Sequence, residues 1–470
     1  MRALALDVPG PSPSHPPAIA EERLDPDAVR VIARLRHVGH QAYLVGGCVR
    51  DLLLDQKPKD FDVAASAHPG EVRAVFRNCR LIGRRFRLAH VYFRGGKIIE
   101  VATFRKNPVD TAEDLAEPGD LLITRDNVFG TAEEDARRRD FTVNGLFYDP
   151  FVGEVIDYVG GRADLEARRI ATIGEPEIRM QEDPVRTLRA IRFAARLGFA
   201  IEPETFAAMR RHAPELARCA APRLLEETFK ILRCGASARA FDLLRSSGAM
   251  PVLLPALASF YDAADDATRS RFGAHLAALD EVVRSGADPS EAVLLGALLL
   301  HLPDGERATP TERDRLLAEL VASARLPRRI AERTRLALQS QRTFRGQSRR
   351  RRRGFSGQAY FDDALHLLEV TVKATGEGSE HLERWRAESR QGHALDASGA
   401  GGAEQEGAPS HLRAHGRGSP RPAADHPAET APAASDPGGR RRRRRRGGRR
   451  RRRRGGAPSS GAPASGPSQA

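Results

Sequence analysis

The amino-acid sequence predicts an α+β fold, in which a few short strands near the N-terminus precede a long helical region and both ends of the chain are disordered. Short apolar runs bounded by glycine occur before residue 165, whereas helical spacing of apolar residues continues from there to about Ala387. Strands followed by a run of helices are typical of the α+β class. Beyond Ser389, small residues, proline and arginine dominate, so we expect disorder there.

Local signals place the elements of the N-terminal part. Asp25 and Pro26 fit the N-cap and the first position of a helix. Gly95-Gly96 separates two apolar runs and indicates a β-hairpin. Thr131, followed three residues later by a glutamate, suits a capping box. The expected elements are a helix from Asp25-Pro26, a strand at 43–45, a helix at 48–54, a strand at 61–63, a helix from Pro69, a hairpin of 90–93 with 97–102, and a helix after Thr131.

The segment 106–126 lacks apolar periodicity, and we expect it to form a mobile loop. Farther along, one helix is predicted between Asp183 and Leu197. Arginines recur there at spacings of three and four along one broad face, with Leu188 and Ile191 roughly opposite. Such a stripe is ordinarily a solvated face. The acidic residues beside it and the motifs upstream favour a binding face instead.

The composition describes a folded part that is nearly neutral and carries a basic tail. Seven arginines at 440–446 and six at 449–454 account for all but one unit of the formal net charge of +14. The longest apolar run, 292–302, is too short to cross a bilayer and reads as a buried helix. The proline-rich start of the chain lacks the apolar segment of a secretory signal. Four cysteines without metal-ligand spacing favour reduced thiols, so we expect a cytoplasmic protein without membrane contact.

One pair of motifs points to chemistry on phosphates. Residues two apart on a strand face the same side, so Asp60 and Asp62 can present both carboxylates to one cavity. Magnesium takes such oxygen ligands together with substrate phosphates. The glycines at 46 and 47 let backbone amides approach a triphosphate, and Arg50 can hold its charge. Glu100, between two apolar residues of a predicted strand, is a natural third metal-binding carboxylate.

Each of these motifs is weak when it is taken alone. A lone Asp-x-Asp is usually a solvated edge or turn, and a lone Gly-Gly is weaker still. Their combination, in this order and at this spacing, favours a metal and triphosphate site.

The sequence resembles the nucleotidyltransferase branch that contains bacterial poly(A) polymerases and CCA-adding enzymes. The resemblance covers roughly Asp25 to Ala387 and rests on four ordered segments: LVGGCVRDLLLDQKPKDFDV at 44–63, RRRDFTVNGLFYDP at 137–150, IDYVGGRADL at 156–165 and EDPVRTLRAIRFAARLGF at 182–199.

This resemblance implies a small mixed-sheet nucleotidyltransferase head followed by an all-α neck and body. The implied divisions are a flexible leader at 1–24, the catalytic head at 25–165, the neck at 166–235, an RNA-binding body at 236–388 and an arginine-rich tail at 389–470. It also implies residue roles. The catalytic set is Asp60, Asp62 and Asp140; the nucleotide-binding set is Gly46, Gly47, Arg50, Arg139, Glu182, Asp183, Arg186, Arg189 and Arg192; the metal set is Asp60, Asp62 and Glu100.

The implied reaction adds AMP from ATP to RNA 3′ ends without a template, in mRNA polyadenylation and RNA turnover. Two Mg²⁺ ions, with Mn²⁺ as the alternative, would activate the 3′-hydroxyl and offset charge on the leaving pyrophosphate. The neck residues Glu182, Asp183 and Arg186 would read the base, because an acceptor and donors on one rigid helix can match a base edge. The sequence identifies no protein partner.

Two alternatives stay open. CCA addition to tRNA uses the same catalytic and base-reading motifs; against it, residues 81–90 resemble the poly(A) polymerases, and the chain lacks a His-Asp dipeptide. A non-catalytic RNA-binding protein would use the arginine tail, but it would have no need of the carboxylates at 60, 62, 100 and 140.

We predict that the arginine tail raises RNA affinity in a salt-dependent way, because arginines that neutralise phosphates release counterions. Deleting residues from Gly438 onward should weaken RNA binding at low salt and flatten the dependence of the affinity on salt. Filter binding of a generic RNA across a salt series measures both effects. Unchanged affinity at low salt would contradict the prediction.

Overall fold

The computed structural model describes residues 19–83, 87–106, 128–302, 312–323, 326–346 and 355–400. Most of the predicted leader, the segment predicted as a loop at 106–126 except its first residue, and the predicted tail from residue 401 onward lie outside the described residues. Ile19, within the predicted leader, is buried in the core, and a short helix η1 (Glu21–Arg23) follows it. The last helix runs across the predicted boundary at 388 and ends at Ala400.

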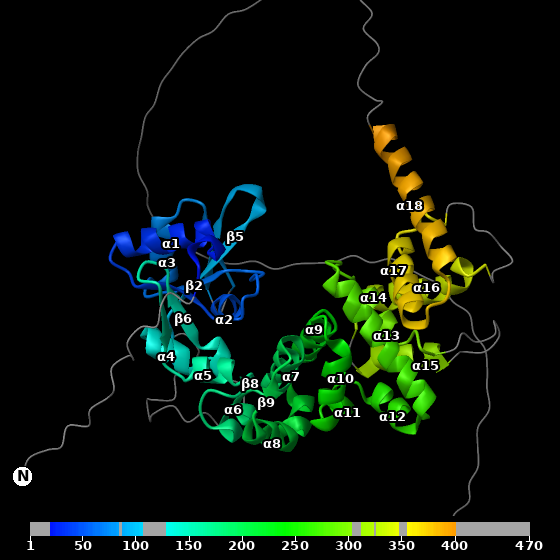
Figure 1. The fold of residues 1–470 in the computed structure, drawn as a ribbon, viewed down its shortest axis with the longest axis horizontal. Coiled ribbons are helices and arrows are strands. Elements are labelled where there is room, and N and C mark those ends of the chain that lie inside the picture. The colour runs from blue at the N-terminus through cyan, green and yellow to red at the C-terminus, as the bar shows by residue number, and fades with distance from the viewer. Residues whose placement is uncertain are drawn as a thin grey trace, which may run out of the picture. The chain divides into compact units, whose positions relative to one another are not determined.

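The α+β class is confirmed, and the strands gather in the N-terminal head (Figure 1). Seven strands form one sheet in the order β3-β4-β5-β2-β1-β6-β7. Only β2 and β5 pair in parallel, so the sheet is mixed. The strands are β1 (Ala42–Val45), β2 (Asp62–Ala65), β3 (Cys79–Ile82), β4 (Leu88–Tyr92), β5 (Ile98–Thr103), β6 (Leu146–Asp149) and β7 (Glu154–Asp157).

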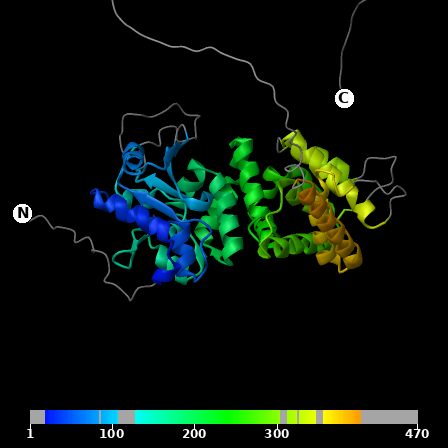
Figure 2. The same ribbon diagram turned by 90° about the horizontal axis from the view of Figure 1, so that it is seen from above.

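Helices cover both faces of this sheet. Val63 and Ala65 of β2 join the main core, to which α1, α2 and α3 contribute, whereas Ala64 packs with α4 on the other face. Figure 2 shows the dark blue α1 beside the strands. The head helices are α1 (Pro26–His37), α2 (Gly47–Leu53), α3 (Pro69–Val75), η2 (Arg94–Gly96), α4 (Ala132–Arg137), η4 (Thr142–Asn144) and α5 (Gly161–Glu166).

The local signals identified several of these head elements, although β3, β6, β7 and α5 were not predicted. The Asp25 carboxylate accepts hydrogen bonds from two backbone amides of α1, and Thr131 and Glu134 form the capping box of α4. The predicted hairpin is the antiparallel pair of β4 and β5. Gly95 and Gly96 both have positive φ in its turn, a conformation that favours glycine.

The neck begins with a small parallel pairing. Strand β8 (Arg169–Ile170) pairs with β9 (Ala200–Ile201), which brings together the two ends of a segment that contains α6 (Pro176–Glu182) and α7 (Val185–Leu197). Leu188 and Ile191 of α7 are fully buried, as the arginine spacing predicted. The neck continues with α8 (Pro203–His212), η5 (Ala213–Arg218) and α9 (Ala221–Leu232).

The described part of the body is entirely helical, and an aromatic cluster around Phe344 and Trp385 packs its last helices together. The run at 292–302 is buried, as expected, although its α-helix ends at Ala297. The body helices are α10 (Ser237–Ser246), α11 (Met250–Leu253), α12 (Pro255–Ala263), α13 (Asp266–Arg284), α14 (Glu291–Ala297), α15 (Glu312–Ser323), α16 (Arg328–Phe344), α17 (Phe361–Thr375) and α18 (Ser379–Ala400).

The motif at 156–165 has a structural task in the head. The Asp157 carboxylate accepts hydrogen bonds from the amides of Val159, Gly161 and Arg162, which fixes the start of α5. A Cβ atom on Gly161 would lie 2.2 Å from the backbone oxygen of Thr142 in η4. Only glycine therefore lets α5 support η4, the turn that ends in Asn144.

Gly161→Ala should destabilise the protein by about 1–3 kcal/mol, because the added methyl group overlaps a backbone atom that cannot rotate away. The unfolding midpoint in denaturant measures the effect. Gly273→Ala in α13 is the matched control: a Cβ there meets nothing within 4 Å, so it should raise stability by up to about 1 kcal/mol. Equal effects of the two substitutions would contradict this account of α5.

Candidate active site

A cavity of about 580 Å³ lies where the head meets the neck helix α7. Side chains from α2, from the segment before β2, from the turn after α4 and from α7 line it. Seven of them are cationic and five are acidic, a balance that suits a polyanionic ligand. The lining residues are Gly46, Gly47, Cys48, Arg50, Asp51, Lys59, Asp60, Asp62, Arg138, Arg139, Asp140, Asn144, Asp183, Arg186, Arg189, Phe193 and Arg196.

The turn at Gly46 and Gly47 forms one wall of the cavity. β1 ends at Val45 and α2 begins at Gly47, with Gly46 as its N-cap at φ 75°. A Cβ atom on Gly46 would lie 3.0 Å from Arg139 Nη1. The backbone conformation therefore favours glycine at position 46, and a larger residue would also displace the end of the Arg139 side chain.

The two aspartates occupy the same cavity, although β2 begins at Asp62 and Asp60 precedes it. Asp62 lies on the α4 side of the sheet, two residues before Ala64, and it pairs in register with Glu100 of β5. Burial, with the nearby charge of Glu100, raises the pKa of Asp62 to about 6. A divalent cation would relieve this crowding of negative charge.

Glu100 lies beside Asp62 but outside the cavity lining. Its carboxylate oxygen is 3.2 Å from His90 Nε2 on β4. Among the described residues, no three or more histidine, cysteine, aspartate or glutamate side chains form a group that could hold a metal ion. The predicted three-carboxylate set is therefore not assembled, and the pair Asp60 and Asp62 is what faces the cavity.

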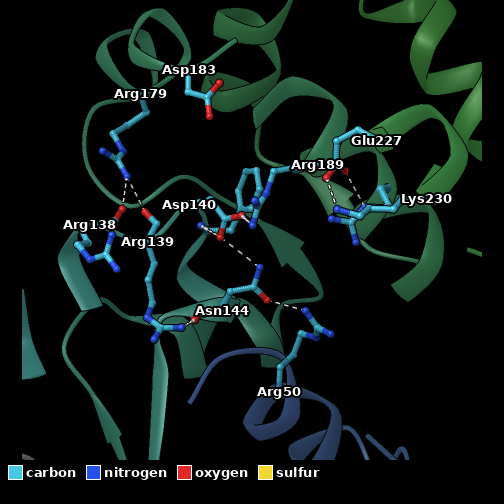
Figure 3. A network of polar contacts seen from close by, with 12 residues as sticks. Arg50, Arg138, Arg139, Asp140, Asn144, Arg179, Asp183, Arg189, Glu227 and Lys230 are labelled. Atoms are coloured by element: carbon cyan, nitrogen blue, oxygen red, sulfur yellow. Dashed lines mark hydrogen bonds and ion pairs between the residues drawn. The ribbon is translucent and has the colours of Figure 1, made fainter. Parts of the chain in front are cut away.

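Asp140 and Asn144 connect the head to the opposite wall. Asp140 Oδ1 accepts hydrogen bonds from the Phe141 amide and from Asn144 Nδ2, and Oδ2 lies 2.6 Å from Arg189 Nη2. Burial raises the pKa of Asp140, but the Arg189 charge and these hydrogen bonds outweigh it, so the net shift is downward. Figure 3 shows Asn144 between Asp140 and Arg50.

Arg50 is more deeply engaged than the sequence suggested. Its side chain is 2% exposed, and its guanidinium donates to Asp51 Oδ1 at 2.6 and 2.8 Å and to Asn144 Oδ1 at 2.5 Å. It also lies over the ring of Phe193 at 5.3 Å. Arg50 lines the cavity, but most of its hydrogen-bonding capacity serves the protein itself.

The neck supplies Asp183, Arg186 and Arg189 to the cavity. Glu182 does not line it: the carboxylate holds Arg179 Nη1 at 2.7 Å and Arg186 Nη1 at 2.9 Å. The buried Arg179 also donates to the backbone oxygens that precede Asp140, at 2.9 and 2.6 Å (Figure 3). Glu182 therefore positions the Arg186 side chain without facing the cavity itself.

Arg192 also lies outside the cavity lining, contrary to the predicted arginine set. Its Nε is 3.1 Å from Glu227 Oε2 on α9, and its guanidinium covers the outer side of Phe193 at 4.4 Å. The helix face that carries the stripe is broad, so only some of its arginines reach the cavity. Arg192 belongs to the packing of α7 against α9.

Sequence reasoning missed several lining residues, above all Asp51, Asn144, Phe193 and Arg196. All four lie within the segments at 44–63, 137–150 and 182–199 that carry the family resemblance. Their contacts join positions 94 and 145 residues apart, which no spacing rule reveals. The four cysteines are free, with Cys48 and Cys79 buried, and no helix among the described residues is long and apolar enough to span a membrane.

The sequence of this chain is similar to those of known proteins. Residues 42–171 match the family model of the poly A polymerase head domain, and residues 198–261 match that of the probable RNA and SrmB-binding site of polymerase A. Poly(A) polymerase I of Salmonella typhi is 38% identical over 395 residues, which cover 80% of this chain and 84% of that protein. The CCA-adding enzyme of Geobacillus stearothermophilus is 39% identical over 232 residues, 49% of this chain and 55% of the enzyme.

Solved structures agree with the sequence matches. The Bacillus stearothermophilus CCA-adding enzyme in complex with CTP superposes with a TM-score of 0.59 at 29% identity, over 77% of this chain and 82% of that one. The mixed-sheet head, the helical neck and the cavity between them define a nucleotidyltransferase. Within that class the chain belongs to the bacterial poly(A) polymerase family, which is related to the CCA-adding enzymes.

Asp62→Asn should stabilise the metal-free protein at high pH. A carboxyl whose folded-state pKa lies above its unfolded value lowers stability as pH rises through about 4 to 6, and the full penalty of up to about 3 kcal/mol remains above that range. Asparagine removes the penalty, so the gain should appear at pH 8 and vanish near pH 4. Denaturant unfolding with a chelator at both pH values measures it.

The exposed Asp60 provides the control for this measurement. Asp60→Asn should change the free energy of unfolding by no more than about 0.5 kcal/mol at either pH. A gain from Asp62→Asn that is equal at pH 4 and pH 8 would show that the charge of Asp62 is not its source.

Proposed function

We propose that this protein is a template-independent polynucleotide adenylyltransferase, which transfers AMP from ATP to the 3′-hydroxyl of RNA and releases pyrophosphate. One observation carries the proposal. A single cavity holds a glycine turn and two carboxylates on its head side and an aspartate with arginines on its neck side. These are the groups needed for a triphosphate with its metal and for a base.

Different residues of the chain would bind the phosphates and the base of the nucleotide. The Gly46-Gly47 turn brings backbone within reach of the phosphates, and Arg139, held by Asp135 at 3.0 Å, faces the same wall. Asp183 and Arg186, at the start of α7, would meet the base edge. The 3′-oxygen attacks the α-phosphorus, the new ester bond forms, and the bond from that phosphorus to the leaving pyrophosphate breaks.

Divalent cations belong to this proposal as well. Asp60 and Asp62 would hold Mg²⁺, or Mn²⁺ in its place, because both carboxylates face the cavity and a cation would offset the burial and the Glu100 charge that raise the pKa of Asp62. When bound, such ions polarise the attacking hydroxyl and the phosphates. Asp140, already paired with Arg189, serves the geometry of the site, not metal binding.

CCA addition is the second candidate function. The solved relative that binds CTP and the match to a CCA-adding enzyme favour it. The poly(A) polymerase match covers 80% of this chain, whereas the CCA-adding match covers 49%, which favours adenylyl transfer. We place the activity in RNA polyadenylation and turnover in the cytoplasm, a setting that suits four free thiols.

Incubation with Mg²⁺, a generic RNA and each nucleotide singly tests the function. We expect long tails from ATP alone and no comparable extension from CTP. CMP followed by AMP on truncated tRNA, without tails on the generic RNA, would establish CCA addition instead.

Asp62→Ala tests the site itself. It should lower nucleotide addition by at least about 10³-fold, as loss of a group that stabilises the transition state does, while RNA binding stays unchanged. Gel-based extension and filter binding on the same preparation separate the two effects. Full activity of this variant would refute the metal-binding role of Asp62, and joint loss of both properties would indicate a folding defect.

A further inference from the structure

Three side chains of α7 face the head along one line of the helix. Arg189, Phe193 and Arg196 are spaced by four and three residues, so they share one helix face. Arg189 lies 2.6 Å from Asp140, Phe193 lies under the Arg50 guanidinium, and Arg196 Nη2 donates to Asp51 Oδ2 at 3.1 Å. The helix is therefore held by the head at two points about two turns apart.

A continuous series of hydrogen bonds among head residues connects these two points, so that the contacts form a ring. Asp140 accepts from Asn144 Nδ2 at 3.3 Å, Asn144 Oδ1 accepts from Arg50 Nη1 at 2.5 Å, and Arg50 donates to Asp51 at 2.6 and 2.8 Å. The ring returns to α7 through Arg196. We call this ring the α7 clamp, and its members are Arg50, Asp51, Asp140, Asn144, Arg189 and Arg196.

The clamp depends on head and neck being docked. Asp51 is 4% exposed and Arg50 is 2% exposed. The Asp51 charge is compensated by Arg50 and by Arg196 of α7, and the Arg50 charge mainly by Asp51. Removal of one partner from a buried ion pair leaves an uncompensated charge, which is far more costly than removal of an exposed pair. A shift of α7 along the head would separate these ion pairs and leave buried charges without partners. The clamp therefore opposes such a shift.

The position of α7 matters because the base-facing residues stand at its start. Asp183 and Arg186 come just before and in its first turn, while the phosphate-facing turn and the aspartates belong to the head. The clamp thus fixes the distance between the two ends of the nucleotide site. A small displacement of α7 would move Arg186 relative to the glycine turn by the same amount.

We propose that Asp51 and Arg196 are positioning residues that determine nucleotide selectivity. They would act without touching the base. They would hold α7 at the distance from the Gly46-Gly47 turn that fits an adenine nucleotide and not a smaller pyrimidine nucleotide. This inference rests on the proposed function. It adds a specificity role for an ion pair that joins α2 of the head to α7 at the edge of the cavity.

The test compares the kcat/KM values for ATP and CTP in the full-length protein. Asp51→Asn and Arg196→Gln should each lower the ATP-to-CTP ratio by about tenfold or more, since small misplacements of positioned groups have large effects on rate. The double variant should show the same ratio as Asp51→Asn alone, because Arg196→Gln removes only an ion pair that Asp51→Asn has already broken. Ratios that multiply in the double variant would overturn the proposal.

A matched ion pair inside the head supplies the control. Arg36 Nη2 and Asp149 Oδ2 are 2.6 Å apart and the Asp149 carboxylate is also buried, but this pair does not reach α7. Asp149→Asn should lower stability and leave the ATP-to-CTP ratio within about twofold of the unmodified protein. An equal loss of selectivity in this variant would show that general destabilisation is the cause.

The outcomes separate this inference from the proposed function. Failure of the unmodified protein to add AMP would refute the function. Normal AMP addition with an unchanged ratio in both Asp51→Asn and Arg196→Gln would refute only the clamp. Should Asp51→Asn fail to fold, Arg196→Gln decides the matter, since the Arg196 side chain is 36% exposed and its replacement leaves the Arg50–Asp51 pair in place.

Discussion

The charges of the cavity hold one another in place, and the rest of the site depends on this constraint. Arg50, Asp51 and Asp140 are buried, where an unpaired charge would be costly. Each is therefore surrounded by partners, and those partners come from two parts of the chain that are distant in sequence. The same side chains line the cavity and join the head to the neck, so the cavity and this joint form one structure.

Much of the head could be predicted because its signals are local. The N-cap at Asp25, the capping box at Thr131 and the glycine turn of the hairpin each involve residues within a few positions. The mixed sheet could not be derived in this way, because the parallel pairing of β2 with β5 joins residues far apart in the sequence. That the sheet is mixed was implied by the family resemblance alone. Short-range rules identify elements, and long-range contacts decide how they join.

The sequence predicted the two carboxylates that face the cavity from the head and did not predict the residues that support the site. Asp60 and Asp62 stand out in the sequence because two carboxylates near a glycine pair are unusual. Glu182 and Arg192 belong to the same motifs, yet their side chains serve neighbouring helices, since a helix presents several faces and the sequence does not say which one meets the ligand. Asn144 was missed because a neutral amide gains meaning only between two charged partners.

The short pairing of β8 with β9 has a consequence for how this family can change over evolution. It ties residue 170 to residue 201 and so encloses α6 and α7 in a loop of fixed perimeter. An inserted or deleted residue within α7 would rotate the rest of the helix by about 100° relative to the head. Length variation should therefore accumulate outside this helix, while the helix itself varies only by substitution.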